Sequence, residues 1–154
     1  MYQPNCWYYV DGVKKKLGYR IIIDNAREGK TLEVWGDPKS KKEMVYVKDF
    51  VQMVQCCVNS SLDGGIYNLG CGHPISIEDQ IKTIAEVFAP SHHSEIVYRP
   101  EKPSSPQFVL SIEKAQRELG YEPKYSFLAM MEDFKLEMEN EPFAKLWGYG
   151  VDYA

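Results

Sequence analysis

A short glycine motif is the first feature of this sequence with the residue types and spacing to do chemistry. Gly70-Cys71-Gly72 has the first two glycines of a dinucleotide-binding loop, but Pro74 follows and the third glycine is missing. An isolated pair of this kind is common in turns between a strand and a helix. We therefore interpret it as a turn and expect this chain alone to bind no dinucleotide cofactor.

The histidine pair His92-His93 has side chains that could bind a metal ion. No cysteine, aspartate or other histidine stands at ligand spacing around it, and adjacent residues rarely bind the same tetrahedral ion. We expect a solvent-exposed loop at this point and no metal site.

Tyr98 and Lys102 have the spacing of a catalytic pair in which a lysine lowers the pKa of a tyrosine. Such a pair must lie one turn apart on a helix. Pro100 and Pro103 interrupt the segment, and residues before prolines are disfavoured in the helical conformation. We reject this pair and expect no catalytic residue in the chain. The run Lys39, Lys41 and Lys42, judged by charge alone, favours a solvent-exposed turn over an anion site.

The composition argues against a nucleic-acid-binding, membrane-spanning or secreted protein. The 154 residues include 18 Lys and Arg against 22 Asp and Glu, a net charge of −4 that argues against nucleic acid as a partner. No apolar stretch approaches the roughly 20 residues of a membrane span, and no secretory signal is visible. The four cysteines have no C-x-x-C spacing, which indicates reduced thiols. We expect a cytoplasmic protein of one mixed α/β domain.

The apolar spacing predicts short strands joined by four to five helices. Two helix ends are marked clearly. Ser76, with Asp79 three residues later, is typical of an N-cap, and Gly120 is typical of a helix C-terminus. The helix after Lys48 is expected to turn Phe50, Val51, Val54 and Cys57 inward. The expected helices cover residues 17–28, 48–58, 77–88, 113–119 and 126–140, and the expected strands cover 32–35, 44–47, 66–69 and 95–99.

Four further motifs resemble those of a known family and stand in the same order. The segment from Gly36 to Asp49 is similar to "GDG-x-x-x-R-D-F-x-Y-V-D-D", and Ile66-Tyr67-Asn68-Leu69-Gly70 is similar to "vyNlG". Tyr98-Arg99-Pro100 resembles "RP(G)D", and the segment from Lys114 to Pro123 resembles "KA-x-x-e-LGW-x-P". Together with the helix after Ser76, these match the extended short-chain dehydrogenases, which are NAD-dependent nucleotide-sugar epimerases and dehydratases.

The resemblance covers only the C-terminal, substrate-binding part of that family. It implies a chain that begins with residues 1–16 leading out of a missing N-terminal domain, continues as a substrate-binding subdomain over 17–140 and ends in a tail over 141–154. The Rossmann half, with the NAD loop and the catalytic tyrosine and lysine, would lie outside this chain. NAD would then belong to the full-length parent, and the missing Rossmann domain would be a partner.

The resemblance also implies the binding residues. In the family, the strand before the GDG turn contacts the nucleotide base, which places Glu33, Val34 and Trp35 at the base. Two cations hold the diphosphate, and these positions correspond to Lys42 and Arg99 here. Lys42 replaces an arginine and keeps its charge without the bidentate fork.

Two further positions depart from the family pattern. Met44 replaces the phenylalanine of the R-D-F motif, and Lys102 falls near the position of an aspartate that contacts the ribose.

The resemblance and these departures leave two possible functions. One is the nucleotide-sugar-binding part of an epimerase or dehydratase, inactive alone; the alternative is a non-catalytic binding or assembly module with the same fold. The apolar surface that would meet the missing domain predicts a homo-oligomer.

Overall fold

The computed structural model describes residues 7–89, 93–104, 106–107, 109–142 and 144–147. His92 of the expected loop lies outside these residues. The chain forms a mixed α/β fold of short paired strands and helices. The strands are β1 (Trp7–Val10), β2 (Val13–Lys16), β3 (Leu32–Trp35), β4 (Lys41–Lys42), β5 (Ile75–Ser76) and β6 (Ile96–Arg99). The helices are α1 (Gly18–Arg27), α2 (Val47–Asn59), α3 (Ile77–Phe88), α4 (Glu113–Leu119), α5 (Phe127–Asn140) and α6 (Ala144–Trp147).

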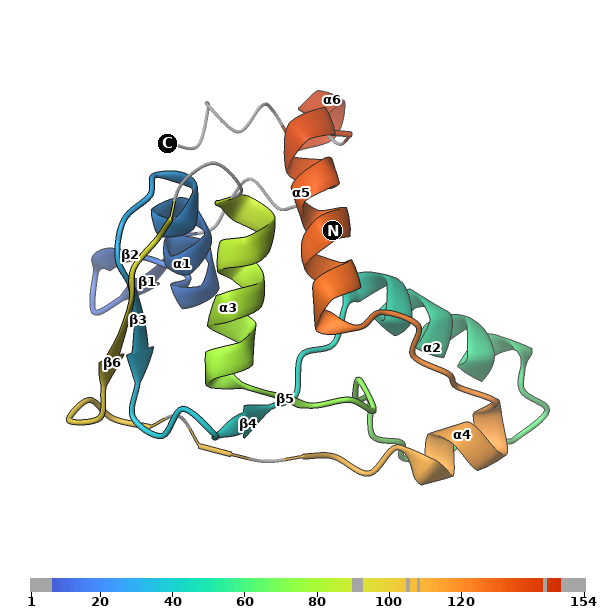
Figure 1. Ribbon diagram of the computed structural model, residues 1–154. Coiled ribbons are helices and arrows are strands. Elements are labelled where there is room, and N and C mark those ends of the chain that lie inside the picture. The colour runs from blue at the N-terminus through green and yellow to red at the C-terminus, as the bar shows by residue number, and fades with distance from the viewer. Residues whose placement is uncertain (1–6, 90–92, 105, 108, 143, 148–154) are drawn as a thin grey trace.

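The strands form three separate pairs. β3 and β6 run parallel, whereas β1 with β2 and β4 with β5 run antiparallel. In Figure 1, α3 stands between α1 and α5, and the β3–β6 pair lies on the far side of α1 from α5. α2 and α4 form the opposite end of the molecule.

The main core lies between the β3–β6 pair and three helices. Leu32 and Val34 of β3 are 1% and 0% exposed, and they pack with apolar side chains of α1, α3 and α5. The helical contributors are Ile23, Ala26, Ile81, Ile84, Val87, Phe88, Phe127, Met130, Met131 and Phe134. A smaller cluster of Met53, Ile112, Ala115 and Tyr121 joins α2 to α4. The helices predicted at 77–88 and 126–140 are confirmed, the second beginning one residue later at Phe127.

Two predicted strands are wrong. β4 ends at Lys42, Met44 and Tyr46 pack against the main core, and α2 already begins at Val47. An apolar run such as 44–47 fits a buried connection as well as a strand. Only pairing with another strand distinguishes the two, and the local pattern does not show whether such a partner exists. Residues 66–69 also form no strand in the described part of the chain, and Ile66 is 90% exposed. This segment is held to α4 by Tyr67, whose hydroxyl donates to Glu118.

The inward face predicted for α2 is also wrong. Phe50, Val51 and Val54 are 46–50% exposed and Cys57 is exposed, whereas Asp49 and Met53 are the buried side chains of this helix. Hydrophobicity alone could not distinguish a face that packs within the chain from one left open.

The hairpin of β1 and β2 was missed, although its turn carries a recognised signal. Asp11 and Gly12 both have positive φ, 50° and 76°, as a type I′ turn requires. Lys14 lies 4.5 Å from the ring centroid of Trp7 on the paired strand. The Asp-Gly pair between two short β-prone runs could have predicted this hairpin.

The N-cap of α3 gives a first testable prediction. The Ser76 hydroxyl accepts a hydrogen bond from the Asp79 N–H, and the side chain is 6% exposed. Ser76→Ala should lower the free energy of unfolding by about 1 kcal/mol, measured by urea denaturation. Ser60→Ala is the control and should change it little, because the hydrogen bond that the Ser60 hydroxyl accepts from the Leu62 N–H is exposed to water. Equal effects of the two changes would contradict the capping role.

Candidate functional site

The parallel strands β3 and β6 bring together most of the residues expected at a binding site. Glu33 pairs in register with Val97, and Trp35 with Arg99. Because side chains alternate along a strand, Leu32 and Val34 enter the core while Glu33 and Trp35 face the other side. The carboxyl ends of parallel strands are where open α/β sheets bind ligands.

The carboxylate of Glu33 connects two functional side chains. The Trp35 indole N–H donates to Oε2 at 2.8 Å, and Arg99 Nε donates to Oε1 at 3.0 Å. These hydrogen bonds, the one from Trp35 first, hold the pKa of Glu33 below its usual value. Trp35 is 50% exposed and the Arg99 side chain 43%, so both are open to a ligand.

Lys102 completes this cluster. Its backbone N–H donates to the Arg99 carbonyl at 3.1 Å, which closes a turn directly after β6. The ammonium group lies 5.5 Å from the ring centroid of Trp35, within cation–π range. Glu33, Trp35, Arg99 and Lys102 therefore form one exposed cluster, and we call it the β3–β6 cluster. It presents an aromatic ring with two cations and one anion.

The turn after β3 is shaped by Gly36. Its φ is +66°, and a Cβ at this position would lie 2.2 Å from Ser104 Oγ and 2.7 Å from Ser104 Cα. The close approach lets the Asp37 N–H donate to Ser104 Oγ at 2.9 Å. Only glycine combines this backbone conformation with this contact. The turn thus joins the end of β3 to the loop after β6.

The same turn continues into the start of α3. The carbonyls of Ser40 and Pro38 accept hydrogen bonds from the N–H groups of Ile77 and Glu78, at 2.9 and 3.2 Å. These bonds use N–H groups that the first turn of a helix leaves without partners inside the helix. The β3 turn therefore has a fixed position relative to α3.

The other sequence-predicted residues lie elsewhere. Lys42 is on β4, which pairs with β5 rather than with β3 or β6. Val34 is fully buried, so only its backbone can face a ligand. Met44 packs against the main core. Glu33, Trp35 and Arg99 are thus brought together, and the participation of Lys42 and Met44 stays a prediction.

Sequence reasoning missed a second carboxylate network beside this site. Glu78 of α3 accepts hydrogen bonds from Lys82 at 2.7 Å, Tyr98 at 2.7 Å and Lys39 at 3.1 Å. These partners, Lys82 first, lower the pKa of Glu78 to about 2. The i, i+4 spacing of Glu78 and Lys82 could have revealed one of the pairs. Because its three partners come from α3, from β6 and from the turn after β3, the network joins these elements, and we assign it to structure.

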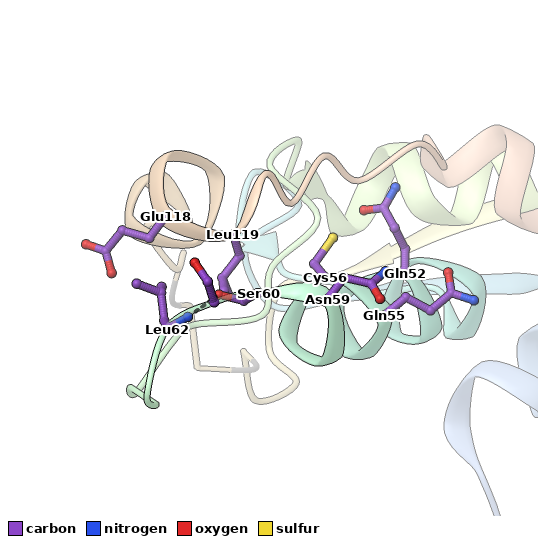
Figure 2. Close-up of a pocket in the computed structure, with 9 residues that line it drawn as sticks. Gln52, Gln55, Cys56, Asn59, Ser60, Leu62, Glu118 and Leu119 are labelled. Atoms are coloured by element: carbon purple, nitrogen blue, oxygen red, sulfur yellow. Dashed lines mark hydrogen bonds between the residues drawn. The ribbon is translucent and has the colours of Figure 1, made fainter.

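A hollow beside α2 does not suit an anionic ligand. It has a volume of about 500 Å³ and lies between the C-terminal half of α2 and α4 (Figure 2). Its lining is mostly uncharged and polar: Gln52, Gln55, Cys56, Asn59, Ser60, Ser61, Leu62, Glu118 and Leu119. A diphosphate needs cations or clustered N–H donors, so the β3–β6 cluster is the better candidate.

In the part of the chain that the structure describes, no three His, Cys, Asp or Glu side chains lie together in a way that could hold a metal ion. Within the same residues, no helix has the length and hydrophobicity needed to cross a membrane.

Comparisons with known proteins find one family model and several relatives. The sequence model of the NAD dependent epimerase/dehydratase family matches residues 16–70. The chain is 26% identical over 114 residues to dTDP-glucose 4,6-dehydratase of Shigella flexneri, a match that covers 70% of this chain and 32% of that protein. The chain thus spans about a third of the length of the curated relatives it matches.

Solved structures show the same fold. UDP-N-acetylglucosamine 4-epimerase from Bacillus cereus superimposes with a TM-score of 0.69 at 20% identity, over 86% of this chain and 43% of that one. UDP-glucuronic acid 4-epimerase from Bacillus cereus, solved with UDP-glucuronic acid and NAD, gives a TM-score of 0.65 at 21% identity. That match covers 79% of this chain and 40% of the epimerase.

Proposed function

We propose that this chain, whose residues 16–70 match the NAD dependent epimerase/dehydratase family, forms the nucleotide-sugar-binding part of such an enzyme. It contributes the substrate site, and the hydride and proton transfers take place on residues supplied by another part of the enzyme. The chain alone is then a binding unit without turnover.

The observation that carries this proposal is the composition of the β3–β6 cluster. A nucleoside diphosphate has a flat aromatic base and a dianionic diphosphate, a few ångströms apart. The cluster offers an exposed indole at Trp35 and, directly across the strand pair, an exposed guanidinium at Arg99. A guanidinium binds phosphate oxygens through paired N–H groups, and an aromatic ring stacks on a base.

Each proposed contact has a role. Glu33, Val34 and Trp35 lie at the base, with Val34 contributing backbone groups only. Arg99 and Lys42 bind the diphosphate from two sides, which requires β4 to lie within reach of the end of β6. Met44 shapes the site from the core side.

The chain's own glycine motif does not fit NAD. Gly70 and Gly72 lie against Ile112: a Cβ on Gly70 would come within 2.8 Å of Ile112 Cγ2, and one on Gly72 within 3.2 Å of Ile112 Cδ1. β5 separates this motif from α3, so the glycines do not lead directly into a helix as those of a pyrophosphate-binding loop do. The glycines serve packing, and we assign the NAD site to the other part of the enzyme.

The exposed side of α2 is the proposed contact with that other part. Phe50, Val51, Val54 and Val58 are 46–77% exposed, and we call these four residues the α2 apolar face. Residues 66–69 form neither helix nor strand, and Tyr67 and Leu69 pack against the cluster that contains Met53 of α2. A helix with an open apolar face beside such a segment suits packing onto a further sheet. The same face favours the second candidate function, a non-catalytic assembly module.

Titration with UDP and dTDP tests the proposed function. Arg99→Ala should weaken nucleotide binding about 10- to 100-fold, because a charge-assisted hydrogen bond contributes roughly 1.5–3 kcal/mol. If Lys42 binds the same diphosphate, the effects of Lys42→Ala and Arg99→Ala should not add in the double variant. Calorimetry measures both quantities.

Two controls accompany the titration. Lys30→Ala removes an exposed lysine paired with Glu28 near the start of the β3 segment, and it should leave UDP affinity unchanged. NAD should show no saturable binding to the chain. Unaltered UDP affinity in Arg99→Ala would refute the assigned site, and absence of any nucleotide binding would favour the assembly module.

A further inference from the structure

We propose that Glu33 is a positioning residue, which fixes the indole of Trp35 and the guanidinium of Arg99 relative to each other so that one nucleotide engages both. This inference rests on the proposed function, since it concerns the same site. It adds a role that the base-contact assignment of Glu33 does not contain. The carboxylate acts through its two neighbours rather than by binding the ligand itself.

The geometry assigns one carboxylate oxygen to each neighbour. Oε2 accepts the indole N–H of Trp35 at 2.8 Å, and Oε1 accepts Nε–H of Arg99 at 3.0 Å. Glu33 and Trp35 are two residues apart on β3 and so share a face, and Arg99 pairs in register with Trp35 on β6. A single side chain therefore fixes both the tilt of the ring and the direction of the guanidinium.

The groups left open by these bonds are those that a nucleotide uses. The bond from Arg99 uses Nε and leaves the N–H groups of the two terminal nitrogens for phosphate oxygens. The bond from Trp35 uses the edge of the indole, and Lys102 lies over one ring face, so the opposite face is left for stacking. Fixing flexible side chains before binding reduces the conformational entropy lost when the ligand binds.

The charge balance of the cluster permits a carboxylate beside a diphosphate. Arg99 and Lys102 both face Glu33, and with them the cluster has one positive charge in excess. The hydrogen bonds from Trp35 and Arg99 keep the pKa of Glu33 low, so the carboxylate is ionised and accepts both bonds at neutral pH. An isolated carboxylate at this position would repel the phosphates.

The chain contains a closely matched control. Glu118 of α4 likewise accepts from one aromatic donor, the Tyr67 hydroxyl at 3.1 Å, and from one guanidinium, that of Arg117 at 2.8 Å. It lies at the opposite end of the molecule from β3 and β6 (Figure 1). Glu33→Gln and Glu118→Gln thus remove the same charge from the same kind of network.

The experiment combines indole NMR with UDP titration of the full chain. The indole N–H signal of Trp35, assigned by its loss in Trp35→Phe, should move in Glu33→Gln and stay in place in Glu118→Gln. In the wild-type chain it should shift as acid protonates Glu33, and this pH response should vanish in Glu33→Gln. UDP affinity should fall about tenfold in Glu33→Gln alone, because the amide can accept only one of the two bonds.

The outcomes separate this inference from the proposed function. If the wild-type chain binds UDP and Glu33→Gln binds it equally well, the positioning role is overturned. An indole signal that ignores both Glu33→Gln and acid overturns it as well. If the indole signal responds as expected but the wild-type chain binds neither UDP nor dTDP, the proposed function fails, and the role of Glu33 in ligand binding fails with it.

Discussion

Replacing Asp49 with alanine is expected to lower the free energy of unfolding by about 3 kcal/mol. Asp49 is 2% exposed, and its two oxygens accept the backbone N–H groups of Lys124 at 2.8 Å and Tyr125 at 3.2 Å. Alanine leaves both part-buried N–H groups without an acceptor, and an unpaired donor costs roughly 1–3 kcal/mol when it is shielded from water. Urea denaturation followed by circular dichroism measures the change.

Two variants make the Asp49 result specific. Asp49→Asn keeps one oxygen acceptor and should lose about half as much stability, since its amide nitrogen cannot accept the second bond. Asp63→Ala removes an exposed acid from the loop after α2 and should stay within about 0.5 kcal/mol of the wild-type chain. A loss of less than 0.5 kcal/mol in Asp49→Ala would show that the two N–H groups find other partners.

The size of the expected effect follows from where Asp49 lies. Its bonds tie the first turn of α2 to the residues just before α5, and α5 belongs to the main core. Met53, one turn further along α2, belongs to the smaller cluster with α4. The Asp49 carboxylate therefore links the two apolar clusters of the chain through polar contacts.

The chain on its own is expected to self-associate through the α2 apolar face, and Val54→Asp is expected to give a monomer. Val54 is central in that face and 46% exposed. From Phe50 to Asn59 the helix has no charged side chain, so two copies can meet there without like-charge repulsion. A carboxylate buried in such a contact without a partner is strongly unfavourable. Sedimentation velocity over a concentration series measures the state.

A matched change elsewhere separates this surface from general hydrophobicity. Leu136 of α5 is 56% exposed, and Leu136→Asp should associate like the wild-type chain. A wild-type chain that remains monomeric at high concentration would refute self-association. If Leu136→Asp abolished association as Val54→Asp does, the contact would lie outside the α2 apolar face.

Elements set by local signals were predicted well from the sequence. Ser76 caps α3, and Gly120, with φ +67°, ends α4 at the predicted residue. The strand at 32–35 has its predicted bounds, and the strand predicted at 95–99 begins one residue later. Caps and turns depend on neighbouring residues, and the 3.6-residue spacing of α3 depends on one buried face, so the sequence contains the required information.

Features that depend on distant partners were not predictable in this way. Residues 66–69 have strand-like side chains, but a strand exists only where another strand pairs with it. The resemblance placed Glu33, Trp35 and Arg99 in one site, yet nothing in the spacing of residues 33 and 99 indicates that one carboxylate joins the indole and the guanidinium. Asp49 was missed as a structural residue because its partners lie 75 and 76 residues away.

The pairing of β3 with β6 has a consequence for the order of folding. Leu32 and Ile96, which are register partners, are separated by 96 − 32 = 64 positions along the chain. Contacts so distant in sequence require closing a long loop and form slowly, whereas the β1–β2 hairpin and the individual helices form from local contacts. The β3–β6 cluster therefore assembles late. It forms after α3, which lies between β3 and β6 along the chain, has packed against the core. A nucleotide bound there should slow unfolding more than it accelerates folding, because the transition state for folding does not yet contain the finished site.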